Sequence, residues 1–185
     1  MADNASDKAD FLTGVQTITK ALEVLGFVPI LIGGMALVIL GSRRVTQDFD
    51  FVIAKPAESY NQILDVFYDQ GFQLAAKVND RAEITSTIDS RKVAKIRLKL
   101  DLPASAYFLN PKTGLRIDLL FDFPIPAQEL AAEAVAIKVR SSIFRVASDA
   151  HLLRLKQIAK RARTKAGDAD DIAFLQARQQ SRKIK

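Results

Sequence analysis

The chain has 185 residues, of which 27 are lysine or arginine and 21 are aspartate or glutamate, giving a formal net charge of +6. With 49% hydrophobic residues it can bury a normal core as one domain, and the absence of cysteine and the presence of one histidine exclude disulfides, thiolate sites and histidine-rich metal sites. No apolar run approaches the roughly 20 residues of a membrane span. We therefore expect a cytoplasmic protein without a membrane partner. Its positive charge reflects either a polyanionic ligand, such as a nucleotide or nucleic acid, or an ordinary solvated surface.

The N-terminal region predicts a packing helix. Residues 1–8 are small and polar, and we expect them to form a flexible tail. Apolar residues then recur every three or four positions from Phe11 to Leu25, which is the spacing of an amphipathic helix, and Gly26 ends it. We assign no chemistry to this helix.

The next stretch predicts a phosphate-binding turn. A short apolar run ending at Ile32 indicates a buried strand that stops at Gly33 and Gly34, and residues 35–40 are small or apolar enough for a short buried helix. Because glycine has no Cβ, the backbone can approach a phosphate closely, and the following helix offers free N–H groups and the positive end of its dipole.

A second apolar strand follows a polar loop and carries Asp48 and Asp50. Carboxylates at i and i+2 point to one face of a strand, while Phe49, Phe51 and Ile53 point to the other. Neighbouring carboxylates repel each other, and a hard divalent cation relieves that repulsion. The residue types favour Mg²⁺ or Mn²⁺ over zinc. A solvated Asp-x-Asp edge without chemistry is the alternative.

The middle of the chain predicts one helix and several strands. Residues 56–71 have the pattern of a helix, and residues 84–88 are β-prone. Residues 95–100 alternate basic and aliphatic side chains, which predicts a further strand. The basic side chains on one face of that strand are Lys95, Arg97 and Lys99. This face is either solvated or a basic wall beside a triphosphate or an RNA backbone.

A later apolar strand over residues 115–123 contains an acid in an unusual setting. Asp118 has apolar neighbours on both sides, and an acid is rarely buried there without a partner. Asp122 also has apolar neighbours and is the alternative candidate. Asp101, before Leu-Pro, is expected to be a turn residue.

The last part of the chain predicts two short strands and a helix. The strands fall at residues 135–139 and 143–146, and Ser148 has the character of a helix N-cap. His151 lies in the first turn of that helix and is assigned to the surface or the cap. Lys156 borders the buried stripe, where a lysine usually extends its ammonium group toward solvent.

Together these stretches resemble the active-site signature of the nucleotidyltransferase superfamily related to DNA polymerase beta, and more closely its AbiEii-type toxin branch. The shared patterns are Gly-Gly-x-Ala, Arg-x-Thr-x-Asp-x-Asp, an apolar-Asp-apolar-apolar strand, and a helix with Lys-x-x-Ala, Arg-x-Lys and Asp-x-x-Asp-Ile. The matching residues are Gly33, Gly34, Ala36, Arg44, Thr46, Asp48, Asp50, Asp118, Lys156, Ala159, Arg163, Lys165, Asp168, Asp171 and Ile172. The loop before Asp48 contains Arg43 and Arg44 and departs from the form common in other branches, which leaves the preferred base and donor open.

The resemblance implies an α/β (α+β) fold, in which a small mixed sheet is flanked by helices. A single nucleotidyltransferase-like domain would span residues 9–178. Its catalytic core would occupy residues 9–147, and C-terminal helices at 148–178 would close the cleft. Residues 179–185 would form a basic tail.

The resemblance also implies a reaction, which is the Mg²⁺- or Mn²⁺-dependent transfer of a nucleoside monophosphate from an NTP to a hydroxyl group. The implied catalytic residues are Asp48, Asp50, Asp118 and Lys156, and the three aspartates would also be the metal ligands. The implied nucleotide-binding residues are Gly33, Gly34, Arg44, Thr46, Lys156 and Arg163. Asp168 and Asp171 would hold the basic residues in place or take part in the site.

The acceptor and the partners are less defined by the resemblance. RNA, such as a tRNA 3′ end, is favoured as the acceptor, and a protein hydroxyl or a small molecule such as an aminoglycoside is the alternative. If the protein is a toxin of a toxin–antitoxin pair, an antitoxin protein would be its partner. The rival functions are a nucleotide- or RNA-binding module without turnover and a purely structural domain.

Overall fold

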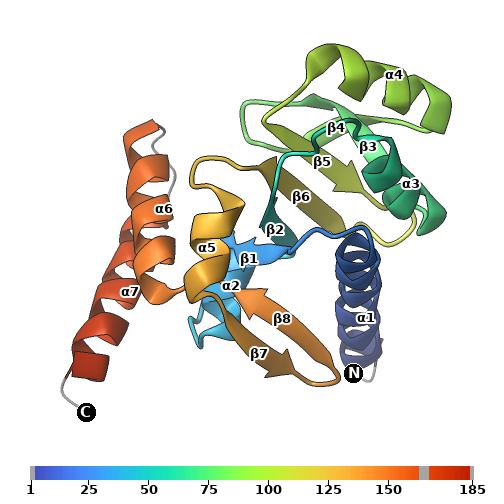
Figure 1. The fold of residues 1–185 in the computed structure, drawn as a ribbon. Helices are drawn as coiled ribbons and strands as arrows, with labels where there is room; N and C mark the ends of the chain where they lie inside the picture. The colour runs from blue at the N-terminus through green and yellow to red at the C-terminus, as the bar shows by residue number, and fades with distance from the viewer. Residues whose placement is uncertain (1–2, 163–166, 184–185) are drawn as a thin grey trace.

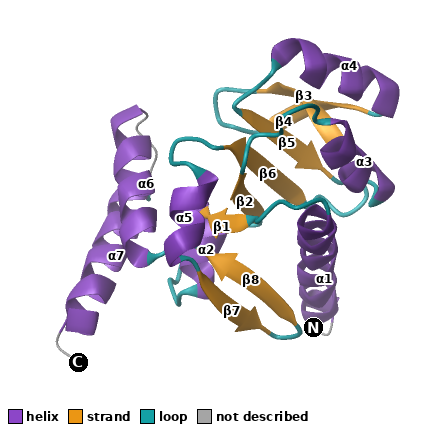
Figure 2. Ribbon diagram, in the orientation of Figure 1, coloured by secondary structure: helices purple, strands orange, loops and turns teal. Residues whose placement is uncertain are grey.

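A mixed β-sheet forms the centre of the molecule, with helices on both sides (Figures 1 and 2). The computed structural model describes residues 3–162 and 167–183, and within them the sheet has eight strands in the order β4-β3-β5-β6-β2-β1-β8-β7. The strands are β1 Ile30–Ile32, β2 Asp48–Ile53, β3 Gln73–Val78, β4 Ile84–Ile88, β5 Ser105–Leu109, β6 Arg116–Phe121, β7 Val135–Val139 and β8 Ser142–Val146. The helices are α1 Asp3–Val24, α2 Gly33–Ile39, α3 Asn61–Asp69, α4 Arg91–Asp101, α5 Ala127–Glu133, α6 Asp149–Ala162 and α7 Asp168–Lys183. The predicted mixed sheet flanked by helices is confirmed.

The central strands set the relative positions of the predicted acids. β1 runs antiparallel to β2, and β2 runs parallel to β6. In that parallel pair Asp48 lies opposite Arg116 and Asp50 lies opposite Asp118. Because side chains alternate between the two faces of a strand, all four side chains share one face of the sheet.

The opposite face of the central strands is part of the hydrophobic core. Phe49 and Phe51 are buried with their rings 6.5 Å apart, and Phe49 also packs against Phe144 of β8. Farther along the sheet, Phe67 of α3 stacks on Phe108 of β5 with ring centroids 3.8 Å apart. This burial fixes which face of β2 is apolar, and the two acids of β2 must therefore face the other way.

The region predicted as a strand over residues 95–100 is a helix, so that prediction was wrong. Ser90 caps α4 by accepting a hydrogen bond from the Val93 backbone N–H, and Ala94 and Leu98 are buried one turn apart. Lysine, arginine and leucine are good helix formers, and no glycine or proline interrupts the segment. Alternation of basic and aliphatic residues over six positions is compatible with a helix as well as a strand.

Several boundaries differ from the prediction. α1 begins at Asp3, within the segment expected to be a tail, and α7 continues to Lys183, within the expected basic tail. β5 and α5 are absent from the sequence-based prediction. The short helix α2, the two strands β7 and β8, and the helix α6 with its Ser148 cap are confirmed. In the part of the chain that the structure describes, no helix is both long and apolar enough to cross a membrane.

Candidate active site

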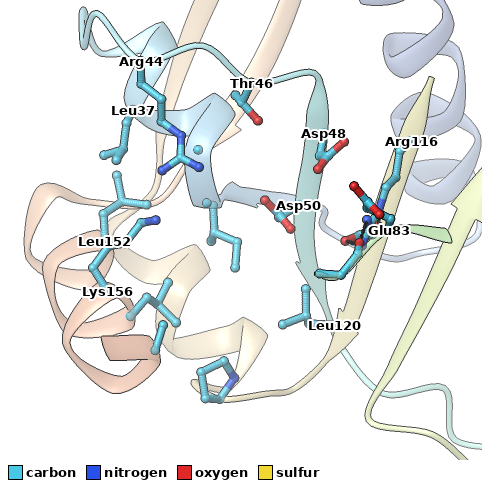
Figure 3. A pocket seen from close by; sticks show the side chains of 18 of the residues that line it. Leu37, Arg44, Thr46, Asp48, Asp50, Glu83, Arg116, Leu120, Leu152 and Lys156 are labelled. Atoms are coloured by element: carbon cyan, nitrogen blue, oxygen red, sulfur yellow. Dashed lines mark hydrogen bonds and ion pairs between the residues drawn. The ribbon is translucent and has the colours of Figure 1, made fainter. Parts of the chain in front are cut away.

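A cleft of about 610 Å³ lies between the acid-bearing face of β2 and β6 and the helices α2 and α6 (Figure 3). Its volume falls in the usual range for a small-molecule or cofactor site. Eight of the predicted site residues line it, and they come from β2, β6, α2, α6 and the loop before β2. These residues are Gly33, Gly34, Arg44, Thr46, Asp48, Asp50, Asp118 and Lys156. Segments separated by more than 100 residues thus meet in one cleft.

The glycine pair brings two charged side chains close to the backbone. Gly33 has a φ of +68°, and a Cβ added to it would lie 2.0 Å from Oδ2 of Asp50. A Cβ added to Gly34 would lie 2.7 Å from Nε of Arg44. Both distances are too short for any side chain. The glycines therefore let Asp50 and Arg44 approach the turn between β1 and α2.

The first wall of the cleft is acidic, and we call Asp48, Asp50, Asp118 and Arg116 the carboxylate wall. Asp48 and Asp50 are partly exposed on β2, whereas Asp118 on β6 is only 5% exposed. Arg116 makes a two-pronged contact with Asp118, in which Nε donates to Oδ1 and Nη2 donates to Oδ2, each at 2.7 Å. Arg116 also lies over the ring of Tyr107, at 5.2 Å. Asp118 thus has the partner that its apolar setting requires.

Charge crowding perturbs the acid–base properties of this wall. Burial raises the pKa of Asp118 to about 7, and the negative charges of Asp50 and Asp48 add to this shift, while the hydrogen bonds from Arg116 oppose it. Burial acts to lower the pKa of Arg116, but the hydrogen bond and charge of Asp118 outweigh it, and the pKa is raised. One guanidinium is therefore surrounded by three carboxyl groups, so acidic groups outnumber the basic group within the carboxylate wall.

A divalent cation would relieve that excess. Within residues 3–162 and 167–183, no three acidic or histidine side chains form a cluster that could hold a metal ion by themselves. Mg²⁺ usually takes one or two carboxylates and completes its shell with water and substrate phosphates. Asp48 and Asp50 are oxygen donors that line the cleft and fit such an ion beside a nucleotide. The role of Asp118 as a third ligand stays a prediction, and it would require the contact with Arg116 to open.

The opposite wall is built from two cations and two buried acids, and we call Arg44, Lys156, Asp168 and Asp171 the ion-pair wall. Lys156 Nζ lies 2.6 Å from Asp171 Oδ2 and 3.3 Å from Asp168 Oδ1. Arg44 Nη1 donates to the same oxygen of Asp171. Asp168 and Asp171 are 3% and 4% exposed. Both acids thus contact basic residues of this wall, and whether they only hold these residues in place or also take part in the site stays a prediction.

Four other residues were singled out in the sequence. Two lie outside the described residues, and the other two, Asp122 and His151, do not line the cleft and have surroundings that differ from those expected. Arg163, the remaining predicted nucleotide-binding residue, lies outside the described residues, as does Lys165. Asp122 follows β6 with a φ of +52°, and its carboxylate accepts hydrogen bonds from the backbone N–H groups of Lys55 and Ala127, at 2.8 Å each. It is therefore a turn-stabilising residue and does not share the face of Asp118. His151 is buried beside Glu129 and Glu133 of α5 and is not a surface residue.

Of the two alternatives for Lys95, Arg97 and Lys99, the basic wall beside the ligand does not hold, because these residues lie on α4. Lys95 pairs with Asp65 of α3 at 2.7 Å, and Arg97 pairs with Asp101, at the end of the same helix, at 3.1 Å. Neither Lys95, Arg97 nor Lys99 lines the cleft. Asp101 accordingly ends a helix and is not a simple turn residue.

Two features of the cleft are missing from the sequence-based prediction. The first is Arg116. It lies two residues before Asp118 on the same strand, and because residues i and i+2 share a face, this spacing could have predicted their contact. The other is the β3–β4 turn, residues 79–83, whose Ala82 carbonyl accepts a hydrogen bond from Arg116 Nη1. Figure 3 shows Glu83 of this turn beside Arg116. The turn reaches the cleft only through the tertiary fold.

The remaining part of the cleft is apolar. It is formed by the end of β6, the segment after it, and the inner face of α6. Its residues are Leu120, Phe123, Pro124, Leu152, Leu155, Ile158 and Ala159. The cleft therefore combines an acidic wall, a wall with two cations and an apolar surface, which is the set of environments that a nucleotide with its metal ion requires.

No protein-family model and no curated protein matches the sequence. Solved structures do match the fold. The structure of ANT(2")-Ia in complex with adenylyl-2"-tobramycin has a TM-score of 0.58 at 13% identity, over 94% of this chain and 91% of that one. A nucleotidyltransferase-like antigenic protein from Paracoccidioides brasiliensis has a TM-score of 0.57 at 14% identity, over 89% and 74%. The lincomycin-bound lincosamide adenylyltransferase LnuA has a TM-score of 0.55 at 12% identity, over 89% and 95%.

These three likenesses cover 89% to 94% of this chain. At such low sequence identities, the matches give information about the fold alone. The AbiEii-type branch stays a prediction from the sequence motifs. The protein has a nucleotidyltransferase-like fold.

Proposed function

We propose that the protein transfers a nucleoside monophosphate from an NTP to a hydroxyl acceptor and releases pyrophosphate. The single observation that carries this proposal is the convergence in one cleft of Asp48 and Asp50 with the Gly33–Gly34 turn and the cations Arg44 and Lys156. Nucleotidyl transfer needs a metal site and a phosphate site side by side, and the adenylyltransferases among the matching structures support the same reaction class.

Each group has a defined task in this proposal. Asp48 and Asp50 would hold Mg²⁺ or Mn²⁺, which when bound polarises the reacting phosphate and neutralises its charge. Lys156 and Arg44 would contact the phosphates and stabilise the negative charge that develops as pyrophosphate leaves. The Gly33–Gly34 turn would accommodate the β- and γ-phosphates, and Thr46 would orient Asp48 or the phosphates.

Asp118 has the properties of a proton acceptor for the attacking hydroxyl. A raised pKa near 7 makes a carboxyl group an effective general base at neutral pH, because proton transfer is best balanced when the pKa is close to the working pH. Its hydrogen bonds to Arg116 hold the carboxylate in a fixed orientation at the boundary between β6 and the cleft.

For the acceptor we favour RNA, such as a tRNA 3′ end, because a chain with a net charge of +6 attracts a polyanion. A toxin with an antitoxin partner is the biological role that the motifs suggest. A small-molecule acceptor is the second candidate. Two of the matching structures carry an antibiotic or its adenylylated product, which are lincomycin and adenylyl-2"-tobramycin.

The direct test incubates the purified protein with each NTP labelled at the α-phosphate, Mg²⁺ and total RNA, and follows the label and pyrophosphate. Parallel reactions replace RNA by tobramycin or lincomycin. We expect label on RNA that is lost in Asp48→Ala. Label on an antibiotic would move the acceptor to the small-molecule class. Mg²⁺-dependent NTP binding without pyrophosphate, with every acceptor and with Mn²⁺, would contradict the enzyme and support a binding module.

A further inference from the structure

Helix α4 presents an apolar stripe to solvent. Val93, Ile96 and Leu100 are 51%, 52% and 76% exposed. They are spaced at i, i+3 and i+7, so they share one side of the helix. Ala94 and Leu98, on the opposite side, are buried where α4 packs on α3 and β4. The solvent face of an ordinary surface helix is polar, and the outer face of α4 departs from that rule.

A further exposed leucine lies directly after the helix. Leu102 is the C-cap of α4, with a φ of +41° in the left-handed region that favours glycine, and its side chain is 60% exposed. Among the described residues, eleven large hydrophobic side chains are exposed, and four of them lie within residues 93–102. Scattered single exposures are normal, whereas a contiguous group marks an interaction surface.

Basic residues border the stripe. On the helical wheel Lys92 and Lys99 lie on one side of it and Arg97 on the other. Arg97 pairs with Asp101, and within residues 3–162 and 167–183 no ion pair is found for Lys92 or Lys99. Residues 91–102 hold five basic residues and one acidic residue. The outer face of α4 is therefore apolar along its centre and positively charged along its borders.

We propose that the outer face of α4 binds an acidic amphipathic helix of a partner protein. Such a helix would place aliphatic side chains on Val93, Ile96 and Leu100 and glutamates or aspartates beside Lys92 and Lys99. A second copy of α4 fits less well, because it would bring two sets of lysines together. A nucleic acid would neutralise the lysines and leave the aliphatic side chains exposed to water.

This surface is separate from the cleft. None of residues 91–102 lines the cleft, and Figure 1 shows α4 at the far end of the sheet from α6 and α7. The proposal therefore does not depend on the proposed enzyme activity, and the charge-neutral variant Ile96→Gln/Leu100→Gln should leave any nucleotidyl transfer unchanged.

The test uses the full chain and a fluorescent helical peptide of about five turns. The peptide has leucines on one face and glutamates elsewhere. A scrambled peptide of equal composition and a peptide with lysine in place of glutamate are the controls. We expect the acidic amphipathic peptide to bind, and the Ile96→Asp/Leu100→Asp double variant to weaken binding at least about tenfold, the loss expected when two aliphatic contacts are removed. Lys92→Glu/Lys99→Glu should also weaken it, and added salt should reduce the difference.

Matched variants separate binding from folding. Val24→Asp replaces an even more exposed aliphatic residue on α1, 88% exposed, and should leave binding unchanged. Ile96→Gln/Leu100→Gln provides an uncharged version of the main variant, and circular dichroism checks that each protein is folded. Equal binding of the scrambled or the lysine peptide, or no binding of the acidic peptide, would overturn the proposal. A dimer that Ile96→Asp/Leu100→Asp dissociates, or binding of the wild-type protein to anionic vesicles that the same variant abolishes, would overturn it in favour of a second copy or a membrane.

Discussion

The two walls of the cleft differ in how their charged side chains are paired. The carboxylate wall gathers three acids around the single guanidinium of Arg116, so negative charge remains in excess. The ion-pair wall sets Arg44 and Lys156 against Asp168 and Asp171, so its charges balance.

This difference in pairing indicates which wall is arranged to bind a cation. Like charges in a poorly solvated site destabilise one another until a counter-ion arrives, whereas a charge-balanced ion-pair network holds its members in one geometry. We infer that the carboxylate wall is arranged for a cation that comes with the substrate. In the proposed function, the ion-pair wall would keep two cations in position for the phosphates of the substrate.

The largest expected effect comes from breaking the carboxylate wall. Asp50→Asn should lower the rate of pyrophosphate release by about three orders of magnitude, because several kcal/mol of metal-dependent stabilisation is lost. The stability of the metal-free protein should be unchanged or higher, since one repelling charge is removed. Stopped-time assays and urea unfolding measure the two quantities. An active Asp50→Asn enzyme would show that this wall has no role in catalysis.

Gly33→Ala tests the close approach of Asp50 to the turn. Its new Cβ would lie 2.0 Å from Asp50 Oδ2, which must displace the carboxylate, and we expect activity to fall by about 100-fold, the effect of a misplacement near 1 Å. Gly26→Ala is the matched control, because Gly26 also has a positive φ, +88°, but nothing lies within 4 Å of its added Cβ. It should cost about 1–2 kcal/mol of stability from backbone strain and leave activity intact. Similar activity in the two variants would contradict the proposed positioning.

The ion-pair wall should respond differently to the loss of an acid. Asp171→Asn removes the ion pair of Arg44 and leaves Lys156 with Asp168 as its partner in this wall, and we expect a loss of about 3 kcal/mol in unfolding free energy. The KM for the NTP should rise by about tenfold, with a smaller change in kcat, because the cations lose their fixed geometry. Asp170→Asn, at an exposed position of the same helix, should be neutral in both measurements. Equal effects of the two variants would remove the distinction between the walls.

Much of the carboxylate wall could be predicted from the sequence because its pattern is local. The buried faces of β2 and β6 are encoded by alternating phenylalanine, leucine and isoleucine, so the faces of Asp48, Asp50 and Asp118 follow from side-chain alternation. The glycine turn and the short helix α2 are equally local. The residues of the ion-pair wall were predicted only from the family motif, because periodicity does not indicate which distant acid contacts Lys156.

The failures have a common physical origin in tertiary contacts. In α4, the alternation of basic and aliphatic residues is compatible with the period of a strand and with that of a helix. The helix is favoured by the Ser90 cap and by the packing of Ala94 and Leu98 on α3 and β4. The contact of the β3–β4 turn with Arg116 depends on a hairpin folding back over the sheet. No short sequence window contains that information.

The last prediction concerns pH and separates the walls in the metal-free protein. Asp118 has a folded-state pKa of about 7, above the 3.8 of an ordinary aspartate, so between these values the folded protein retains a proton that the unfolded chain has lost. Its contribution to the unfolding free energy therefore falls as pH rises from about 4 to 7, by at most about 1.4 kcal/mol per pH unit, and is constant outside this window. Asp118→Asn removes the titrating group, and urea unfolding across this range should show a shallower decline with pH in the variant than in the wild type. Parallel curves would mean that Arg116 keeps Asp118 ionised throughout, in which case the carboxylate wall would be compensated internally and its need for a cation would rest on Asp48 and Asp50 alone.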